Sequence, residues 1–114
     1  MDGLFAFIAQ DVVFDTAHIR DWPEPEYVGH AGLRHFLTEW LEVWDAFEVG
    51  VDEFVAAPDG RVVVLYWQRG RGRHSGLAMD VKWAQINTIR DGKAVRLDMY
   101  DNREEALNDA GLSE

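Results

Sequence analysis

Asp98 is the side chain in this sequence whose type and surroundings best suit proton transfer. It lies in the run Arg96-Leu-Asp-Met-Tyr100. In apolar surroundings the pKa of a carboxylate rises, so that the group can act as an acid or a base near neutral pH. The structural alternative is an aspartate bonded to Arg96, to Trp83 or to a backbone amide.

His18 is the second candidate, in the run Asp15-Thr-Ala-His18. A neutral imidazole can shuttle a proton with a carboxylate. The alternative for His18 is a loop histidine in solvent. His30 and His35 lie five residues apart, which is off the i, i+4 spacing that a metal pair prefers on a helix. We therefore predict no metal site.

Composition and motifs exclude several classes of function. The chain has 114 residues, a formal charge of −10 and no cysteine. Phosphate backbones and anionic lipids would be repelled, so neither nucleic acid nor a membrane is expected as a partner. We expect a cytoplasmic protein without cofactors, because no signal peptide, phosphate loop or dinucleotide fingerprint is present. The alternating Arg69, Arg71 and Arg73 either clamp an anion or lie solvated at a hairpin tip.

The elements that position these residues are predicted by the hydrophobic pattern. Three long strands are expected at Arg61 to Gln68, Ala78 to Ile89 and Ala94 to Tyr100. Asp91-Gly92 between the last two is a strong hairpin signal, because the turn requires positive φ. A long antiparallel sheet twists, and if it also curls it gains a concave face.

One amphipathic helix, from about His30 to Ala46, is predicted to fill that concave face. Its apolar residues recur at steps of three and four: Leu33, Phe36, Leu37, Trp40, Leu41, Trp44 and Phe47. The remaining predicted elements are a helix at Gly3 to Ala9, a strand at Val12 to Phe14, a loop at Thr16 to Gly29, a strand at Phe47 to Ala57, and a helix at Arg103 to Ala110 that is ended by Gly111. The fold class is α+β, with the curved antiparallel sheet wrapped around the long helix.

Five stretches of the sequence resemble the SnoaL-like group of the nuclear transport factor 2 and ketosteroid isomerase superfamily. They are Val12 to Asp15, Tyr27 to Leu37, Gln68 to Arg73, Thr88 to Val95 and Met99 to Leu107. The resemblance implies a single cone-shaped domain over residues 1–114. Members usually begin with a long helix that covers the cone, so we expect this domain to be truncated at that helix. The fold hosts isomerases, hydrolases, cyclases and binding modules, so it does not specify one activity.

The resemblance also implies a pocket lined by the inner faces of three strands. If Asp98 points into the cone, alternation places Arg96 and Tyr100 there too. Asp98 is similar in position to an essential aspartate of limonene epoxide hydrolase and the SnoaL cyclases. Asp15 falls near the base of ketosteroid isomerase, and Gln85 matches its oxyanion-hole acid. The residues predicted to contact substrate are Tyr66, Gln68, Trp83, Gln85, Tyr100, Trp40, Trp44 and Trp22.

Two functions follow from these expectations. The first is a small-molecule-binding protein, acting as a cofactor-free acid–base enzyme of isomerase, cyclase or hydrolase type on an apolar carbonyl or polycyclic compound. The catalytic residues would then be Asp98, His18 and Asp15. The second is a non-catalytic ligand-binding or dimerisation module. Under both, a homodimer is expected through the outer sheet face, formed by Val63, Leu65, Trp67, Ala84, Ile86, Leu97 and Met99.

Overall fold

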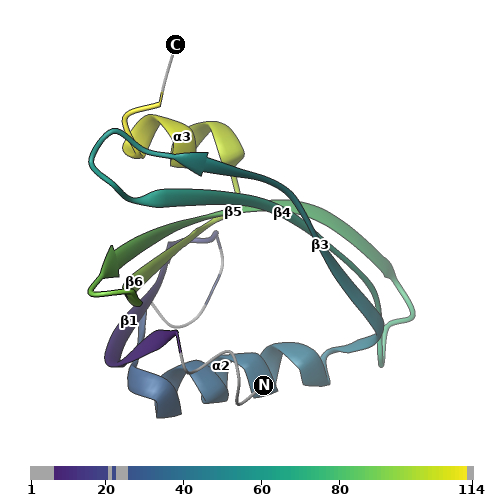
Figure 1. Cartoon of the computed structure of the whole chain (residues 1–114). Coiled ribbons are helices and arrows are strands. Elements are labelled where there is room, and N and C mark those ends of the chain that lie inside the picture. The colour runs from purple at the N-terminus through teal and green to yellow at the C-terminus, as the bar shows by residue number, and fades with distance from the viewer. Residues whose placement is uncertain (1–6, 21, 23–25, 113–114) are drawn as a thin grey trace.

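The computed structural model describes residues 7–20, 22 and 26–112, which form one sheet and two helices (Figure 1). The elements in chain order are β1 (Ile8–His18), β2 (Glu26–Val28), α2 (Gly29–Glu42), β3 (Trp44–Ala56), β4 (Val62–Gly72), β5 (Ala78–Arg90), β6 (Lys93–Tyr100) and α3 (Arg103–Asp109). The strand order across the six-stranded sheet is β2-β1-β6-β5-β4-β3. The predicted α+β class is confirmed.

The sheet is mixed, so the prediction of a wholly antiparallel sheet was wrong. β1 pairs in parallel with β6, whereas every other neighbouring pair is antiparallel. β1 also reaches four residues beyond the predicted end at Phe14, and β2 lies within the predicted loop. Val12, Phe14 and Thr16 alternate as buried residues along β1, which is the period of a half-buried strand.

The long helix is shorter than its apolar stripe indicates. α2 ends at Glu42, and Trp44 already pairs with Gly72 as the first residue of β3. The predicted end at Ala46 was therefore wrong, because cross-strand pairing with β4 overrides the helical period at the stripe's last members. Of the helix predicted at Gly3 to Ala9, residues 3–6 lie outside the described residues, and Ile8 begins β1. No helix among the described residues has the length and apolarity to cross a membrane.

The predicted Asp91-Gly92 hairpin turn is confirmed, whereas β4 extends to Gly72 instead of ending at Gln68. Arg90 pairs with Lys93, and Asp91 and Gly92 between them adopt φ of 53° and 78°. These positive values suit Gly92, which has no Cβ to clash. A turn at Pro58-Asp59-Gly60 joins β3 to β4. Gly111 ends α3 with a φ of 78°.

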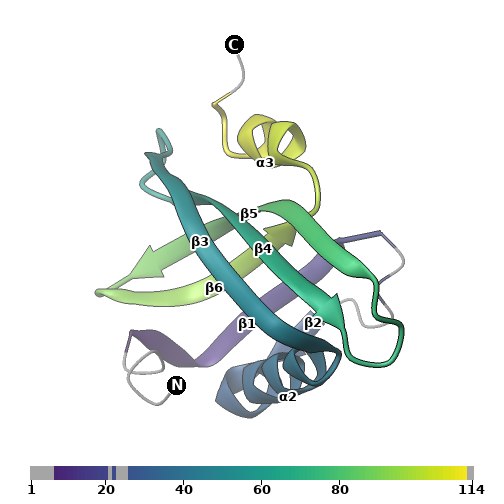
Figure 2. The same ribbon diagram turned by 90° about the vertical axis from the view of Figure 1, so that its right-hand side faces the viewer.

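The two faces of the sheet are covered by different helices (Figures 1 and 2). The sheet arches over α2, which lies against its concave side, and α3 lies on the opposite, convex side. The concave core contains Phe14, Phe36, Tyr66, Trp83 and Met99 among its buried residues. The convex core contains Ala57, Val63, Ala84, Ile86, Tyr100, Ala106 and Ala110.

Most of the outer face that was predicted as a dimer interface is not available to a second chain. Val63, Ala84 and Ile86 are buried beneath α3 of the same chain. Leu97 and Met99 belong to the concave core instead. The prediction of this face was therefore wrong, because a seven-residue helix near the end of the chain already covers the apolar surface.

Candidate functional site

A β-bulge near Val95 decides which side chains of β6 reach the concave face. The β5–β6 hairpin closes with Ile89 opposite Ala94, but the next pair is Thr88 opposite Arg96. β6 thus carries one extra residue, and a one-residue shift turns every following side chain to the other face. Leu97 and Met99 therefore point inward. The prediction that Asp98, Arg96 and Tyr100 point into the cone was wrong.

The other two strands present the predicted residues to the concave side. Tyr66 and Trp83 are buried in the concave core. Gln68 and Gln85 line a cavity there, as expected from the alternation of β4 and β5. These strands lie in register without a bulge, with Tyr66 opposite Trp83, so that alternation persists along their whole length.

Two neighbouring cavities lie between the sheet and α2. The first, the mouth cavity, has a volume of about 310 Å³ and is lined by Phe7, Ile8, Phe14, Leu33, Leu37, Gln85, Asn87, Ile89, Ala94 and Leu97. The second, the inner cavity, has about 230 Å³ and is lined by Phe14, Phe36, Leu37, Trp40, Leu41, Phe47, Val49, Tyr66, Gln68, Gln85 and Met99. They share Phe14, Leu37 and Gln85, so these three side chains form the boundary between them. Their apolar walls with a few polar groups are typical of small-molecule sites.

The polar groups of the cavities are amides, one indole and one phenol. Gln85 Nε2 donates to Asn87 Oδ1 at 2.8 Å, which fixes both side chains on one face of β5. Gln68 Oε1 and Trp40 Nε1 are buried and bond to no described residue. Burial raises the pKa of Tyr66 far above its ordinary value, so its hydroxyl stays protonated. None of the described residues that line either cavity carries a carboxylate or an imidazole.

The predicted tryptophans form a connected cluster at one end of the concave core. The Trp40 ring lies 5.5 Å from Trp22, 5.5 Å from Trp44 and 6.2 Å from Trp83, measured between centroids. Trp22 Nε1 also donates to the Tyr27 hydroxyl. Among these four indoles only Trp40 lines the inner cavity, and the other three rings pack against it.

The predicted catalytic aspartates lie together on the convex side, linked by one arginine. Arg96 Nη2 lies 2.6 Å from Asp15 Oδ2, and Arg96 Nε lies 3.0 Å from Asp98 Oδ1. Burial raises the pKa of Asp98, while the Arg96 guanidinium acts in the opposite direction. This is the structural alternative that the sequence had offered, an Asp98 bonded to Arg96.

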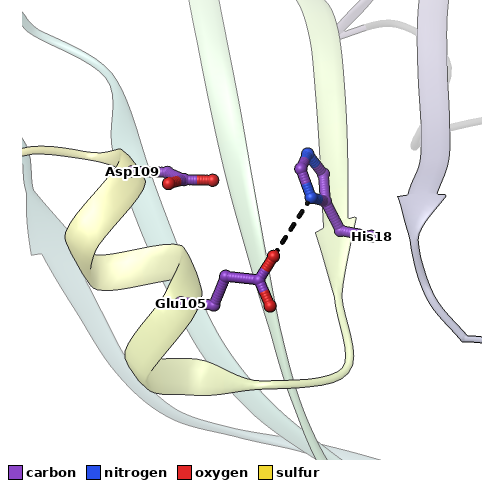
Figure 3. Close-up of side chains that lie close together, drawn as sticks. All are labelled: His18, Glu105 and Asp109. Carbon is purple, nitrogen blue, oxygen red and sulfur yellow. Dashed lines mark ion pairs between the residues drawn. The ribbon is translucent and has the colours of Figure 1, made fainter.

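His18 lies on the same side of the sheet, against α3 (Figure 3). Its ring stacks on Tyr100 at 4.2 Å, and its Nδ1 lies 3.4 Å from Glu105 Oε1. The Tyr100 hydroxyl donates to Asp109 Oδ2 at 2.7 Å. The ligand atoms of His18, Glu105 and Asp109 lie within 4.8 Å of one another, so among the described residues this group could hold a divalent cation.

Several residues of this arrangement were missed by sequence reasoning. Phe14 and Leu37 line both cavities, and the alternation of β1 and the helical period of α2 are the signals that could have found them. Glu105 and Asp109 lie four residues apart on α3, which indicates a shared helix face. Nothing in the sequence connects that face to His18, because the contact depends on how α3 packs.

Three solved structures illustrate the similarity of this fold to known proteins. TerC co-crystallised with polyporic acid superposes with a TM-score of 0.72 and 23% identity, covering 96% of this chain and 83% of TerC. A protein with a ketosteroid isomerase-like fold from Catenulispora acidiphila, in complex with trimethylamine, superposes with a TM-score of 0.73 and 15% identity, covering 97% of this chain and 82% of that protein. An NTF2-like protein from Burkholderia xenovorans superposes with a TM-score of 0.68 and 27% identity, covering 87% of this chain and 74% of that protein.

Sequence comparison leads to the same superfamily. No curated protein matches the chain. The family profile for the SnoaL-like domain matches residues 1–97. This match spans most of the chain and includes every described residue that lines the mouth cavity, from Phe7 to Leu97. The protein therefore belongs to the SnoaL-like domain family.

Proposed function

We propose that this protein binds an apolar small molecule in its concave cavities and that binding, without proton transfer, is its function. The observation that supports this is the separation of the two groups of residues. Asp98, His18 and Asp15 lie on the convex side of the sheet, whereas the cavities lie on the concave side. A general base must come within hydrogen-bond reach of the proton it removes.

The lining of the cavities supports the same proposal. A side chain that shuttles protons near neutral pH needs a pKa in that range. The phenol of Tyr66 has its pKa raised by burial, and the amides of Gln68, Gln85 and Asn87 do not titrate. These groups can orient a ligand by hydrogen bonds but offer no base. Of the two functions expected from the sequence, the non-catalytic binding module is thus the better supported.

The structural neighbours are consistent with a ligand in this fold. TerC was crystallised with polyporic acid, and the protein from Catenulispora acidiphila was crystallised with trimethylamine. Their identities of 23% and 15% support a shared fold, and the ligand chemistry for this chain has to come from its own cavities. A homodimer and a cytoplasmic location stay predictions.

A cavity-filling substitution tests the proposal. Leu37 lines both cavities, so Leu37→Trp should fill the space between them. Isothermal titration calorimetry with 2-methoxynaphthalene, a neutral aromatic probe, should give saturable binding to the wild type and a loss of at least about tenfold in affinity for the variant. The matched control is Leu77→Trp, because Leu77 is 72% exposed on the β4–β5 connection.

Two outcomes would contradict the proposal. The first is an affinity for the probe that Leu37→Trp leaves unchanged while circular dichroism shows a native fold. The second is a probe affinity that Asp98→Asn lowers as strongly as Leu37→Trp does. The second result would place the ligand on the convex side, near Arg96 and His18.

A further inference from the structure

We infer that the inner cavity selects uncharged aromatic ligands that carry a hydroxyl or N–H group, and that Gln68 is the residue that makes this selection. The inference rests on the proposed binding function and specifies its ligand chemistry. It depends on buried polar atoms in the cavity wall that are without a partner among the described residues. Buried polar groups in native proteins nearly always have a hydrogen-bond partner, so such atoms require an explanation.

Gln68 lines the inner cavity and carries a buried acceptor. It comes from β4, its side chain points to the concave side, and only 8% of its surface is exposed. Its Oε1 is buried and accepts no hydrogen bond from the described residues. Its neighbours across the sheet are Val49 on β3 and Val81 on β5, whose side chains cannot donate. An amide oxygen can accept two hydrogen bonds, so a donor supplied by a ligand would satisfy it.

Trp40 carries the complementary donor. It lines the cavity from α2, and its Nε1 is also buried without a described partner. An indole nitrogen can only donate. A ligand hydroxyl can donate to Gln68 and accept from Trp40, whereas an ether oxygen can only accept. The aromatic class follows from the surrounding rings, because Phe14, Phe36 and Tyr66 lie in the same wall and favour stacked or edge contacts.

The described cavity walls carry no charged side chain, and this excludes ionic ligands. Among the described residues, neither cavity is lined by an arginine, lysine, histidine, aspartate or glutamate. A carboxylate or ammonium transferred into such surroundings loses its hydration without gaining a counter-charge. The formal charge of −10 on the whole chain adds a repulsion against anions. A neutral donor such as a phenol avoids both penalties.

Three probes of equal ring size separate these requirements. They are 2-naphthol, which donates and accepts, 2-methoxynaphthalene, which only accepts, and 2-naphthoate, which is charged. Isothermal titration calorimetry at neutral pH should rank wild-type affinity in that order. One neutral hydrogen bond corresponds to an advantage of about five- to tenfold for 2-naphthol over 2-methoxynaphthalene.

Substitutions assign the advantage to Gln68. Gln68→Leu keeps much of the side-chain volume and removes the acceptor, so the affinity for 2-naphthol should fall about five- to tenfold. The affinity for 2-methoxynaphthalene should stay within about twofold, which abolishes the discrimination. The matched control is Gln10→Leu, because Gln10 is exposed on β1. Trp40→Phe should weaken the binding of both neutral probes, since both accept a hydrogen bond.

Each possible result is decisive. Equal affinities of the wild type for the two neutral probes would overturn the assignment, because Gln68 would then present its N–H₂ end or no polar group. Discrimination that survives in Gln68→Leu would assign the selection to another residue. Tightest binding of 2-naphthoate would overturn the uncharged class. In these three cases the proposed binding function stands, whereas binding of none of the probes would remove both proposals.

Discussion

Gln85 on β5 lies directly opposite Met99 on β6, and Asp98 lies opposite Ile86. A hairpin that starts with Arg90 opposite Lys93 and contains no bulge would place Asp98 opposite Gln85 instead. The single extra residue at Val95 thus exchanges an acidic cavity wall for an apolar one. It also places Asp98 and Arg96, which contact each other, on the convex side. The absence of an acid from the described cavity wall is a consequence of register.

The first prediction concerns the pH dependence of stability and Asp98. Burial raises the pKa of this carboxyl above its ordinary value, so the folded protein binds the proton more tightly than the unfolded chain does. The resulting stabilisation is complete below the ordinary pKa of aspartate and is lost as the pH rises through the raised pKa. Asp98→Asn does not titrate. The free energy of unfolding of the wild type minus that of the variant should therefore increase between about pH 7 and about pH 4.

Urea unfolding at a series of pH values measures this difference. Acidic groups that do not interact with Asp98 titrate alike in both proteins and cancel in the subtraction. A difference that stays constant would show that the Asp98–Arg96 contact offsets burial, and one that decreases toward low pH would show that the contact outweighs it.

The second prediction concerns Arg103, which attaches α3 to the sheet. Its Nε donates to the Trp83 carbonyl at 3.1 Å, and its Nη2 donates to the Tyr66 carbonyl and to Asp52 Oδ2, both at 2.8 Å. A lysine cannot reproduce this planar fork. Arg103→Lys should lower the free energy of unfolding by about 1–3 kcal/mol in urea denaturation. The exposed Arg90→Lys, as control, should change it by less than about 0.5 kcal/mol. Equal losses in the two variants would contradict the role of Arg103 in attaching α3 to the sheet.

The third prediction concerns the close approach of Gly50 to Trp67. Gly50 lies opposite Trp67 in the β3–β4 ladder, and a Cβ at Gly50 would overlap the indole ring. Gly50→Ala should destabilise the fold by about 1–3 kcal/mol, because the indole must move. At Gly70 the nearest atom to a Cβ would be Trp44 Cβ at 3.4 Å, which is an ordinary contact. Gly70→Ala should therefore be tolerated, and thermal unfolding compares the two directly.

The fourth prediction concerns the hydroxyl of Tyr100. This side chain is 3% exposed, and its hydroxyl donates to Asp109 Oδ2 across the interface between β6 and α3. Tyr100→Phe should cost about 1.5–3 kcal/mol, the range for a hydrogen bond to a charged acceptor. In a double-mutant cycle with Asp109→Ala, the two substitutions should be non-additive by about 1 kcal/mol or more. Additive losses would mean that the hydroxyl contributes to stability independently of Asp109.

Local chemistry allowed much of the fold to be predicted. The Asp91-Gly92 turn, the strands around it and the apolar stripe of α2 follow from φ preferences and from periods of 2 and 3.6 residues. The inward direction of Gln68 and Gln85 was also predicted, because β4 and β5 pair without interruption. The end of α2 at Glu42 was not predicted, since Trp44 fits the helical stripe and the strand equally well.

By itself, the sequence determined an α+β domain with one long amphipathic helix, a net charge of −10 and aromatic strands suited to an apolar cavity. The tertiary structure decided the rest. It paired β1 in parallel with β6, placed α3 over the convex face and inserted the bulge that turned Asp98 away from the ligand cavities. The physical reason is that strand partners and bulges are selected by packing between distant segments, whereas residue periodicity records only which side of a local element is apolar.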